Sequence, residues 1–107
     1  MKHLTKGLYT VRVIDESSWE VRLTDETHPI FKAHFESNPL LPAFLQIDIL
    51  GELLGKNLQK ISRSKFKLPI LPNDLVLYRV VKKVDSDYSV KIFKDGKVAS
   101  EIKVVYA

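Results

Sequence analysis

The sequence contains no cysteine and only four glycines in 107 residues. Without cysteine the chain cannot form a disulfide, use a thiol nucleophile or hold a metal through thiolates, and it suits a reducing compartment. No apolar stretch is long enough to span a bilayer, since the longest, Leu40–Leu50, is interrupted by Gln46 and Asp48. The charges within Met1–Glu16 also leave no apolar core for a signal peptide. We therefore expect a soluble cytoplasmic protein without membrane insertion.

The net charge is +4, from 17 Lys and Arg against 13 Asp and Glu. Most of the lysines alternate with apolar residues in strand-like segments, which is typical of the solvated face of a sheet. A nucleic-acid-binding domain would concentrate them in a stripe interleaved with aromatics, so we expect no nucleic-acid partner. The lysines and the arginine within residues 56–67 form a candidate binding site for an acidic partner protein.

The three histidines share no short spacing that would favour a metal site. No nucleophile-elbow motif accompanies the serines, so serine hydrolase chemistry is not expected. We predict neither a metal nor a cofactor, and we expect His3 and His28 to have structural or surface roles.

Strand patterns occupy both ends of the chain. Leu8–Ile14 is β-branched and aromatic, and Trp19–Leu23 alternates apolar with polar residues, so the polar Asp15–Ser18 between them predicts a hairpin. Asp95-Gly96 is a strong signal for a second hairpin. The strands predicted in the second half are Lys65–Ile70, Leu75–Val84, Tyr88–Lys94 and Val98–Tyr106.

A helical pattern separates the two groups of strands. Residues 44–58 place apolar side chains almost all round a helix, which is typical of a buried helix, and Pro42 suits its first turn. Residues 24–41 look like turn and loop. Gly51 and Gly55 would weaken an isolated helix, so we expect another backbone to approach closely there.

Two strands, a buried helix and about four more strands predict an α+β fold. Because the connections other than the helix are short, the sheet should be largely antiparallel and wrapped around the helix. This arrangement is the hotdog fold, and we expect one such domain over residues 1–107.

Two side chains suit proton transfer. His34 lies in the predicted loop and has an ordinary pKa of about 6.5, suitable for a general base at neutral pH. Asp48 lies in the most apolar segment, where burial would raise its pKa and make it a proton donor. Alternatively, Asp48, Glu52 and Lys56, spaced by four, form an exposed stripe of charge pairs.

The start of the helix offers a third group. Its first amides, around Ala43 and Phe44, have no acceptor within the helix and could polarise a carbonyl oxygen. A base, an acid and such an amide together would serve removal of an α-proton and loss of a β-hydroxyl group.

Two segments resemble the 3-hydroxyacyl-[acyl-carrier-protein] dehydratases. His34–Asp48 is similar to that family's active-site pattern: Gly-His-Phe, a Pro, then Met-Pro-Gly and an acidic residue six positions after the second Pro, as Asp48 stands after Pro42. Lys65–Asp74 resembles the strand and the Pro-Gly-Asp turn that follow the family's helix. The resemblance covers Phe31–Ala107, with correct spacing between the two segments.

The resemblance implies a hydro-lyase that acts on acyl-carrier-protein or coenzyme A thioesters in fatty-acid or related lipid or polyketide synthesis. It implies that His34 is the base and that the Ala43 amide polarises the thioester. The acid, Asp48, would come from the neighbouring subunit, which implies a homodimer with composite sites or a larger assembly of such dimers. The expected substrate-binding residues are Phe35, Pro42, Ala43 and Phe44.

Three positions depart from the family's pattern. Ala33 and Ala43 stand where the family has glycine, which adds methyl groups close to the expected substrate. Glu52 replaces a glutamine and places a second carboxylate one helical turn from Asp48.

Two other functions remain open from the sequence. A hotdog thioesterase would share the fold but use a carboxylate to direct water at the carbonyl. A non-catalytic acyl-binding protein would keep the fold and the acyl ligand without turnover, because function depends on the site rather than on the fold.

Overall fold

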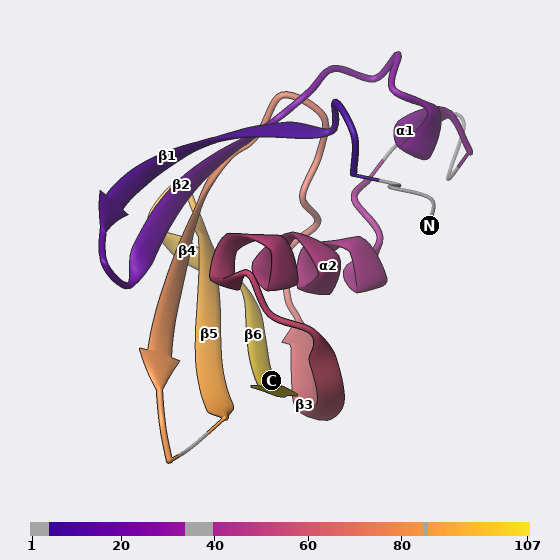
Figure 1. The fold of residues 1–107 in the computed structure, drawn as a ribbon. Helices are drawn as coiled ribbons and strands as arrows, with labels where there is room; N and C mark the ends of the chain where they lie inside the picture. Colours follow the sequence, from indigo (N-terminus) through magenta and orange to yellow (C-terminus); the bar gives the residue numbers. More distant parts are fainter. Residues whose placement is uncertain (1–4, 34–39, 85) are drawn as a thin grey trace.

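The computed structural model describes residues 5–33, 40–84 and 86–107. Within these residues, six strands and two helices follow one another in the order that Figure 1 shows. Their bounds are β1 Tyr9–Asp15, β2 Ser18–Leu23, α1 Pro29–Ala33, α2 Ala43–Leu54, β3 Leu58–Phe66, β4 Leu75–Lys82, β5 Asp87–Lys94 and β6 Lys97–Tyr106.

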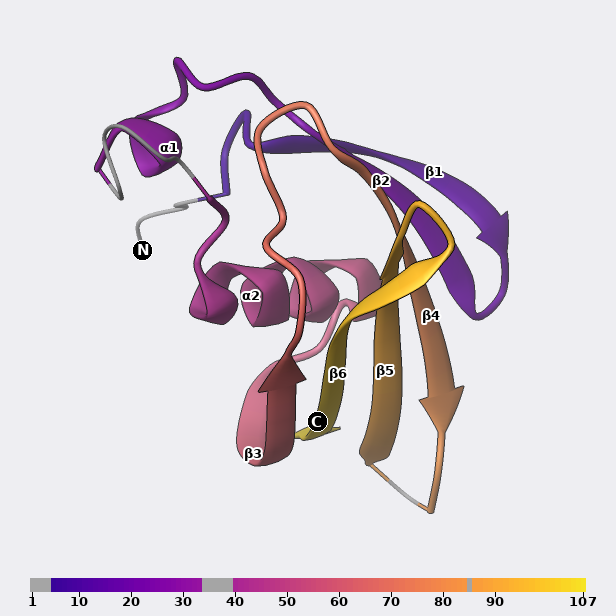
Figure 2. The same ribbon diagram turned by 180° about the vertical axis from the view of Figure 1, so that it is seen from behind.

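The described strands form one sheet in the order β1-β2-β4-β5-β6-β3, and every neighbouring pair is antiparallel. The segment between β2 and β3 contains α1 and α2, and these two strands lie on opposite sides of the sheet's centre. Figures 1 and 2, which are opposite views, both show the sheet curving around α2. The predicted α+β hotdog fold is confirmed.

Both predicted hairpins are present. In the first, β1 pairs with β2 from Tyr9↔Leu23 to Asp15↔Ser18. In the second, β5 and β6 are joined by Asp95 and Gly96, with φ angles of 52° and 76°. Two successive positive φ angles match the right-handed twist of the flanking strands, and Asp and Gly adopt them at low cost.

Three local predictions were wrong. The expected loop contains α1, whose first turn is capped by the His28 ring because Nδ1 accepts the Ile30 amide at 3.1 Å. The helix α2 ends at Leu54, and the next strand is β3, displaced towards the N-terminus from the predicted Lys65–Ile70.

The predicted close approach of a backbone is found at Gly51 and is wrong at Gly55. Gly55 has a φ of 65° and no neighbour within 4 Å of an added Cβ, so its role is to end the helix. A Cβ at Gly51 would lie 3.2 Å from the Tyr106 ring and 3.3 Å from the Lys56 carbonyl oxygen. The close neighbours of Gly51 are therefore an aromatic ring and the chain that immediately follows the helix.

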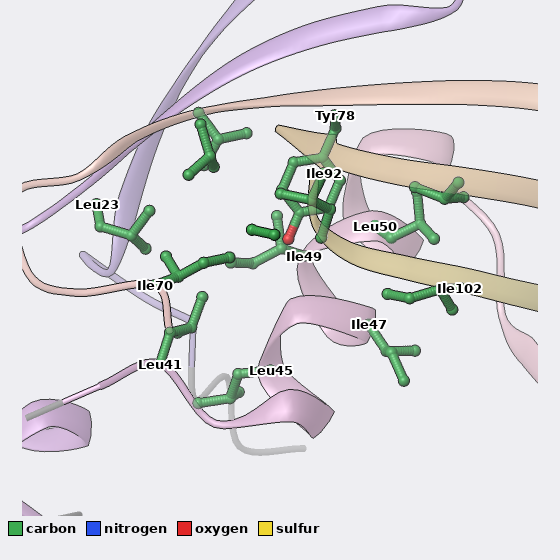
Figure 3. Packing of buried hydrophobic residues seen from close by; sticks show 14 of the residues in the cluster. Leu23, Leu41, Leu45, Ile47, Ile49, Leu50, Ile70, Tyr78, Ile92 and Ile102 are labelled. Carbon is green, nitrogen blue, oxygen red and sulfur yellow. The ribbon is translucent and has the colours of Figure 1, made fainter. Parts of the chain in front are cut away.

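The core lies between α2 and the concave face of the sheet (Figure 3). Strands β4 and β5 alternate buried and exposed residues, as a sheet with one covered face requires. The helix contributes Leu45, Ile49 and Leu50, each fully buried. In the part of the chain that the structure describes, no helix has the length and apolar character needed to cross a membrane.

Candidate active site

The helix α2 has two unlike faces. Its buried residues are Leu45, Gln46, Ile47, Ile49 and Leu50. The side chains of Phe44, Asp48 and Glu52 are exposed, and Phe44 has 49% of its surface accessible. The prediction that Asp48 is buried is therefore wrong for this chain, because the apolar residues around Asp48 in the sequence turn towards the sheet while Asp48 turns away.

The first turn of α2 starts at Pro42, which is buried and extended, with φ −60° and ψ 148°. Its carbonyl oxygen accepts the amides of Leu45 and Gln46 at 3.1 and 3.3 Å. Pro42 provides no side-chain cap, and within the described residues no acceptor binds the Ala43 amide. An amide at this position can donate to a ligand oxygen.

An apolar groove of about 310 Å³ lies beside this helix start. Ala43 lies on its wall, together with residues from the end of β3 and the loop that follows. Sequence reasoning did not assign these later residues to the site, although the segment that contains them resembles a family segment. The lining is Leu40, Leu41, Ala43, Gln46, Phe66, Lys67, Leu68 and Pro69.

Buried polar contacts hold the first turns of the helix in place. The Gln46 Oε1 atom accepts the Ser100 hydroxyl at 2.6 Å, and the Gln46 carbonyl oxygen accepts the Tyr78 hydroxyl at 2.9 Å. Six residues further along β6, the Tyr106 hydroxyl donates to the Ile47 carbonyl oxygen at 2.8 Å. Because β4 and β6 both anchor α2, the position of its amide end is set by the sheet.

Asp48 lies on the exposed side of this anchored helix. Partial burial by its neighbours raises the pKa of the Asp48 carboxyl, and the nearby Glu52 carboxylate raises it further. The pKa of the Tyr106 hydroxyl is raised by burial and, second, by the Asp48 charge. A carboxyl group with a raised pKa is better able to hold a proton and donate it near neutral pH.

Ala43 and Asp48 of one chain lie on different sides of α2, and Asp48 does not line the groove at Ala43. They are five residues apart on α2, and at about 100° per residue this puts them about 140° apart around the helix axis. The groove at Ala43 therefore lacks an acid from its own helix at position 48.

Glu52 lies one helical turn beyond Asp48, and its carboxylate is hydrogen-bonded to two residues that lie outside α2. Its Oε1 accepts the Tyr9 hydroxyl at 2.6 Å, and its Oε2 accepts the Thr5 hydroxyl. The side chains of Asp48, Glu52 and Lys56 are exposed, as the alternative of a charged stripe expects. The stripe nevertheless does not form charge pairs, because none of the ion pairs among the described residues includes Lys56.

The remaining predicted site residues are only partly described. His34 and Phe35 lie outside the described residues. The ring of His28 contacts the Lys6 carbonyl oxygen at 2.8 Å through Nε2, in addition to capping α1, which is a structural role. Among the described residues, no three His, Asp or Glu side chains are grouped in a way that could hold a metal ion.

A protein-family model described as ApeI-like, for the ApeI dehydratase, matches residues 12–103 of this chain. The match includes β2, all of α2 and the strands β3 to β5. It therefore covers both the groove at Ala43 and the exposed carboxylates of the helix.

Curated relatives carry dehydratase names. The 3-hydroxyacyl-[acyl-carrier-protein] dehydratase FabZ of Chromobacterium violaceum is 28% identical over 98 residues, covering 74% of this chain and 65% of that protein. The enzyme of the same name from Rhizobium rhizogenes is 26% identical, covering 82% of this chain and 64% of that protein. The chain thus spans slightly less than two thirds of the length of these relatives.

Solved structures share the fold. A chain of the dehydratase heterocomplex ApeI:P from Xenorhabdus doucetiae superposes with a TM-score of 0.74 at 23% identity, covering 92% of this chain and 94% of that one. An uncharacterised protein from Erwinia carotovora subsp. atroseptica has a TM-score of 0.61 at 25% identity, with 91% and 89% covered.

Proposed function

Because the chain belongs to the ApeI-like dehydratase family, we propose that it converts 3-hydroxyacyl thioesters into trans-2-enoyl thioesters and water. The thioester is carried by acyl-carrier protein or coenzyme A, in cytoplasmic fatty-acid synthesis or a related lipid or polyketide pathway. The observation that carries this proposal is the helix α2, which offers an amide beside an apolar groove and a carboxyl group with a raised pKa on another face.

The proposed chemistry needs one proton removed and one supplied. His34 takes the proton from C2, and the electron pair of that C–H bond forms the C2–C3 double bond. The C3–O bond breaks, and the hydroxyl group leaves as water with the proton of Asp48. The Ala43 amide donates to the thioester oxygen while negative charge develops there. Phe35, Pro42 and Phe44 complete the contacts to the substrate.

We propose that Asp48 serves the groove of a second copy of the chain. The groove at Ala43 is not lined by Asp48 of the same chain, which supports this division, as do the positions of the two residues about 140° apart around the helix axis. The edge strand β3 supports a homodimer, because all its residues are exposed, among them Leu58, Ile61 and Phe66 at 42%, 47% and 40%. Exposed apolar residues on an unpaired strand edge favour association with another chain.

Turnover of 3-hydroxyacyl and 2-enoyl thioesters by the purified protein tests the reaction, with mass spectrometry to identify the products. We expect reversible loss of water, and a fall in kcat of roughly 10²- to 10⁴-fold in both His34→Ala and Asp48→Asn, the range for loss of a general acid or base. Release of free acid would identify a thioesterase instead. Binding of acyl thioesters with no turnover at any chain length would identify a binding protein.

A mixed dimer tests the composite site. When His34→Ala and Asp48→Asn chains are refolded together, a heterodimer with shared sites regains one intact pair, so a statistical mixture should show about a quarter of the wild-type activity. If each chain built its site alone, the mixture would stay as inactive as its parents. Light scattering of the same samples measures the number of chains per particle.

A further inference from the structure

Glu52 has contacts that no other carboxylate on α2 has. The Tyr9 hydroxyl donates to its Oε1 at 2.6 Å, and the Thr5 hydroxyl donates to its Oε2. Both donors come from the N-terminal segment, 43 and 47 residues earlier in the chain, and Thr5 is itself buried. These two hydrogen bonds fix the position of the Glu52 carboxyl group on α2.

Asp48 is four residues before Glu52, so the two side chains are neighbours on the same face of the helix. Two carboxylates this close raise the energy of the doubly ionised state, and one of them keeps a proton to higher pH. Within the described residues no hydroxyl or amide donates to the Asp48 carboxyl. The pair is therefore asymmetric: two hydroxyl groups hold Glu52 in place, whereas Asp48 is the carboxyl group whose pKa is raised.

The other groups that face Asp48 do not reverse this order. From β6, Tyr106 contributes a hydroxyl that donates to the Ile47 carbonyl oxygen and whose own pKa is raised by burial and then by Asp48. From β1, the hydroxyl of Tyr9 points to Glu52, and burial followed by Glu52 raises the pKa of Tyr9. Neither tyrosine brings a positive charge to Asp48.

We propose that Glu52, fixed by Tyr9 and Thr5, is a positioning residue whose negative charge keeps Asp48 in its protonated, proton-donating form. The role assigned to Asp48 rests on the proposed dehydratase function, whereas the coupling of the two carboxyl groups does not. Glutamine, which the resemblance places at this position in related enzymes, accepts hydrogen bonds similarly but carries no charge. The chain thus uses an added carboxylate to extend the range of pH over which its acid holds a proton.

The test is Glu52→Gln, which keeps the shape and an acceptor oxygen for Tyr9 but removes the charge. The ¹³C shift of the Asp48 side-chain carboxyl, followed against pH in the whole protein, reports its titration directly. We expect the titration midpoint of Asp48 to move to lower pH in Glu52→Gln. Glu16→Gln, in the exposed β1–β2 turn, removes one carboxylate far along the chain and should leave the midpoint unchanged.

A second variant removes the two hydroxyl groups that donate to Glu52 and keeps Glu52 itself. In Thr5→Val/Tyr9→Phe, Glu52 loses both hydroxyl contacts and its carboxyl group can turn away from Asp48, so the Asp48 midpoint should again fall. This variant also decides the question if Glu52→Gln does not fold. A midpoint that stays at its wild-type pH in the folded variants would overturn the proposal.

Kinetics connect the coupling to catalysis. The alkaline limb of the kcat profile, where Asp48 loses its proton, should move to lower pH in Glu52→Gln with KM unchanged. A purely structural role for Glu52 would lower kcat at every pH and leave the limb in place, which would contradict the proposal. If instead Asp48→Asn had full activity, the proposed acid would be wrong, while the titration would still decide whether Glu52 controls the Asp48 proton.

Discussion

The inward and outward faces of α2 differ in both composition and surroundings, although they belong to the same 12-residue helix. The inward face has Leu45, Ile49 and Leu50 fully buried, and its one polar side chain, Gln46, is hydrogen-bonded to Ser100. The outward face has Phe44 and two carboxylates, all exposed. The inward face packs against the core of the sheet, whereas the outward face reaches the sheet through the hydrogen bond between Glu52 and Tyr9 of β1.

The difference shows how one short helix can both stabilise the fold and carry a candidate site. A carboxylate on the inward face would lose its hydration without a compensating partner, at a cost of several kcal/mol. On the outward face partial burial raises the pKa of Asp48 without removing it from solvent. Substitutions on the inward face should therefore change stability, and substitutions on the outward face should change chemistry.

Leu50→Ala should have the largest effect on stability. Leu50 is fully buried among Ile102 and other core residues, so truncation leaves a cavity and should lower the free energy of unfolding by about 2–5 kcal/mol. Chemical denaturation at a fixed protein concentration measures this loss. The concentration is fixed because association would contribute to the apparent stability.

Asp48→Asn is the matched control on the opposite face of the same helix. We expect it to change the free energy of unfolding by less than about 0.5 kcal/mol, as exposed substitutions usually do. A loss as large as that of Leu50→Ala would contradict the division of the helix into two roles.

Tyr106→Phe should have an intermediate effect. The ring of Tyr106 stays buried, but its hydroxyl no longer donates to the Ile47 carbonyl oxygen, so we expect a loss of about 1–2 kcal/mol. Tyr88→Phe is the matched control, because Tyr88 is buried edge-to-face against Tyr106 at 6.1 Å and contributes no hydroxyl contact to α2. Thermal or chemical unfolding measures the free energy of unfolding of both variants. The difference between their losses is the contribution of the hydrogen bond to α2, because both variants lose a tyrosine hydroxyl. Equal losses in the two would show that the contact to the helix contributes nothing specific.

Much of the fold could be predicted because its signals are local. The alternation in Trp19–Leu23 and the turn residues Asp95-Gly96 each determine the structure of their own segment. The strand β3 was misplaced because all nine of its residues are exposed, so it lacks the alternation of a half-buried strand. The helix α1 was missed because it is only five residues long and its cap is a histidine ring.

The candidate site could be predicted only in part, because its contacts are not local. Asp48 was recognised from the residues around it, but its exposure depends on which side of α2 meets the sheet. The contacts of Glu52 with Tyr9 and Thr5 link residues more than 40 positions apart, and no spacing in the sequence indicates them. The groove beside Ala43 likewise forms only when the loop after β3 folds back to the helix start.

Gly55→Ala should have a smaller effect than Leu50→Ala or Tyr106→Phe, because Gly55 lies at the end of α2 and on neither face. Its φ of 65° is in the left-handed region, and its amide donates to the Glu52 carbonyl oxygen while the Lys56 amide donates to Gly51. No atom lies within 4 Å of an added Cβ, so the only cost is backbone strain, about 1 kcal/mol. Gly55→Asn should cost less, because Asn adopts this conformation more readily than Ala. Unfolding measurements that rank Ala and Asn equally would show that the helix end relaxes, and that the boundary of α2 is not fixed by this one residue.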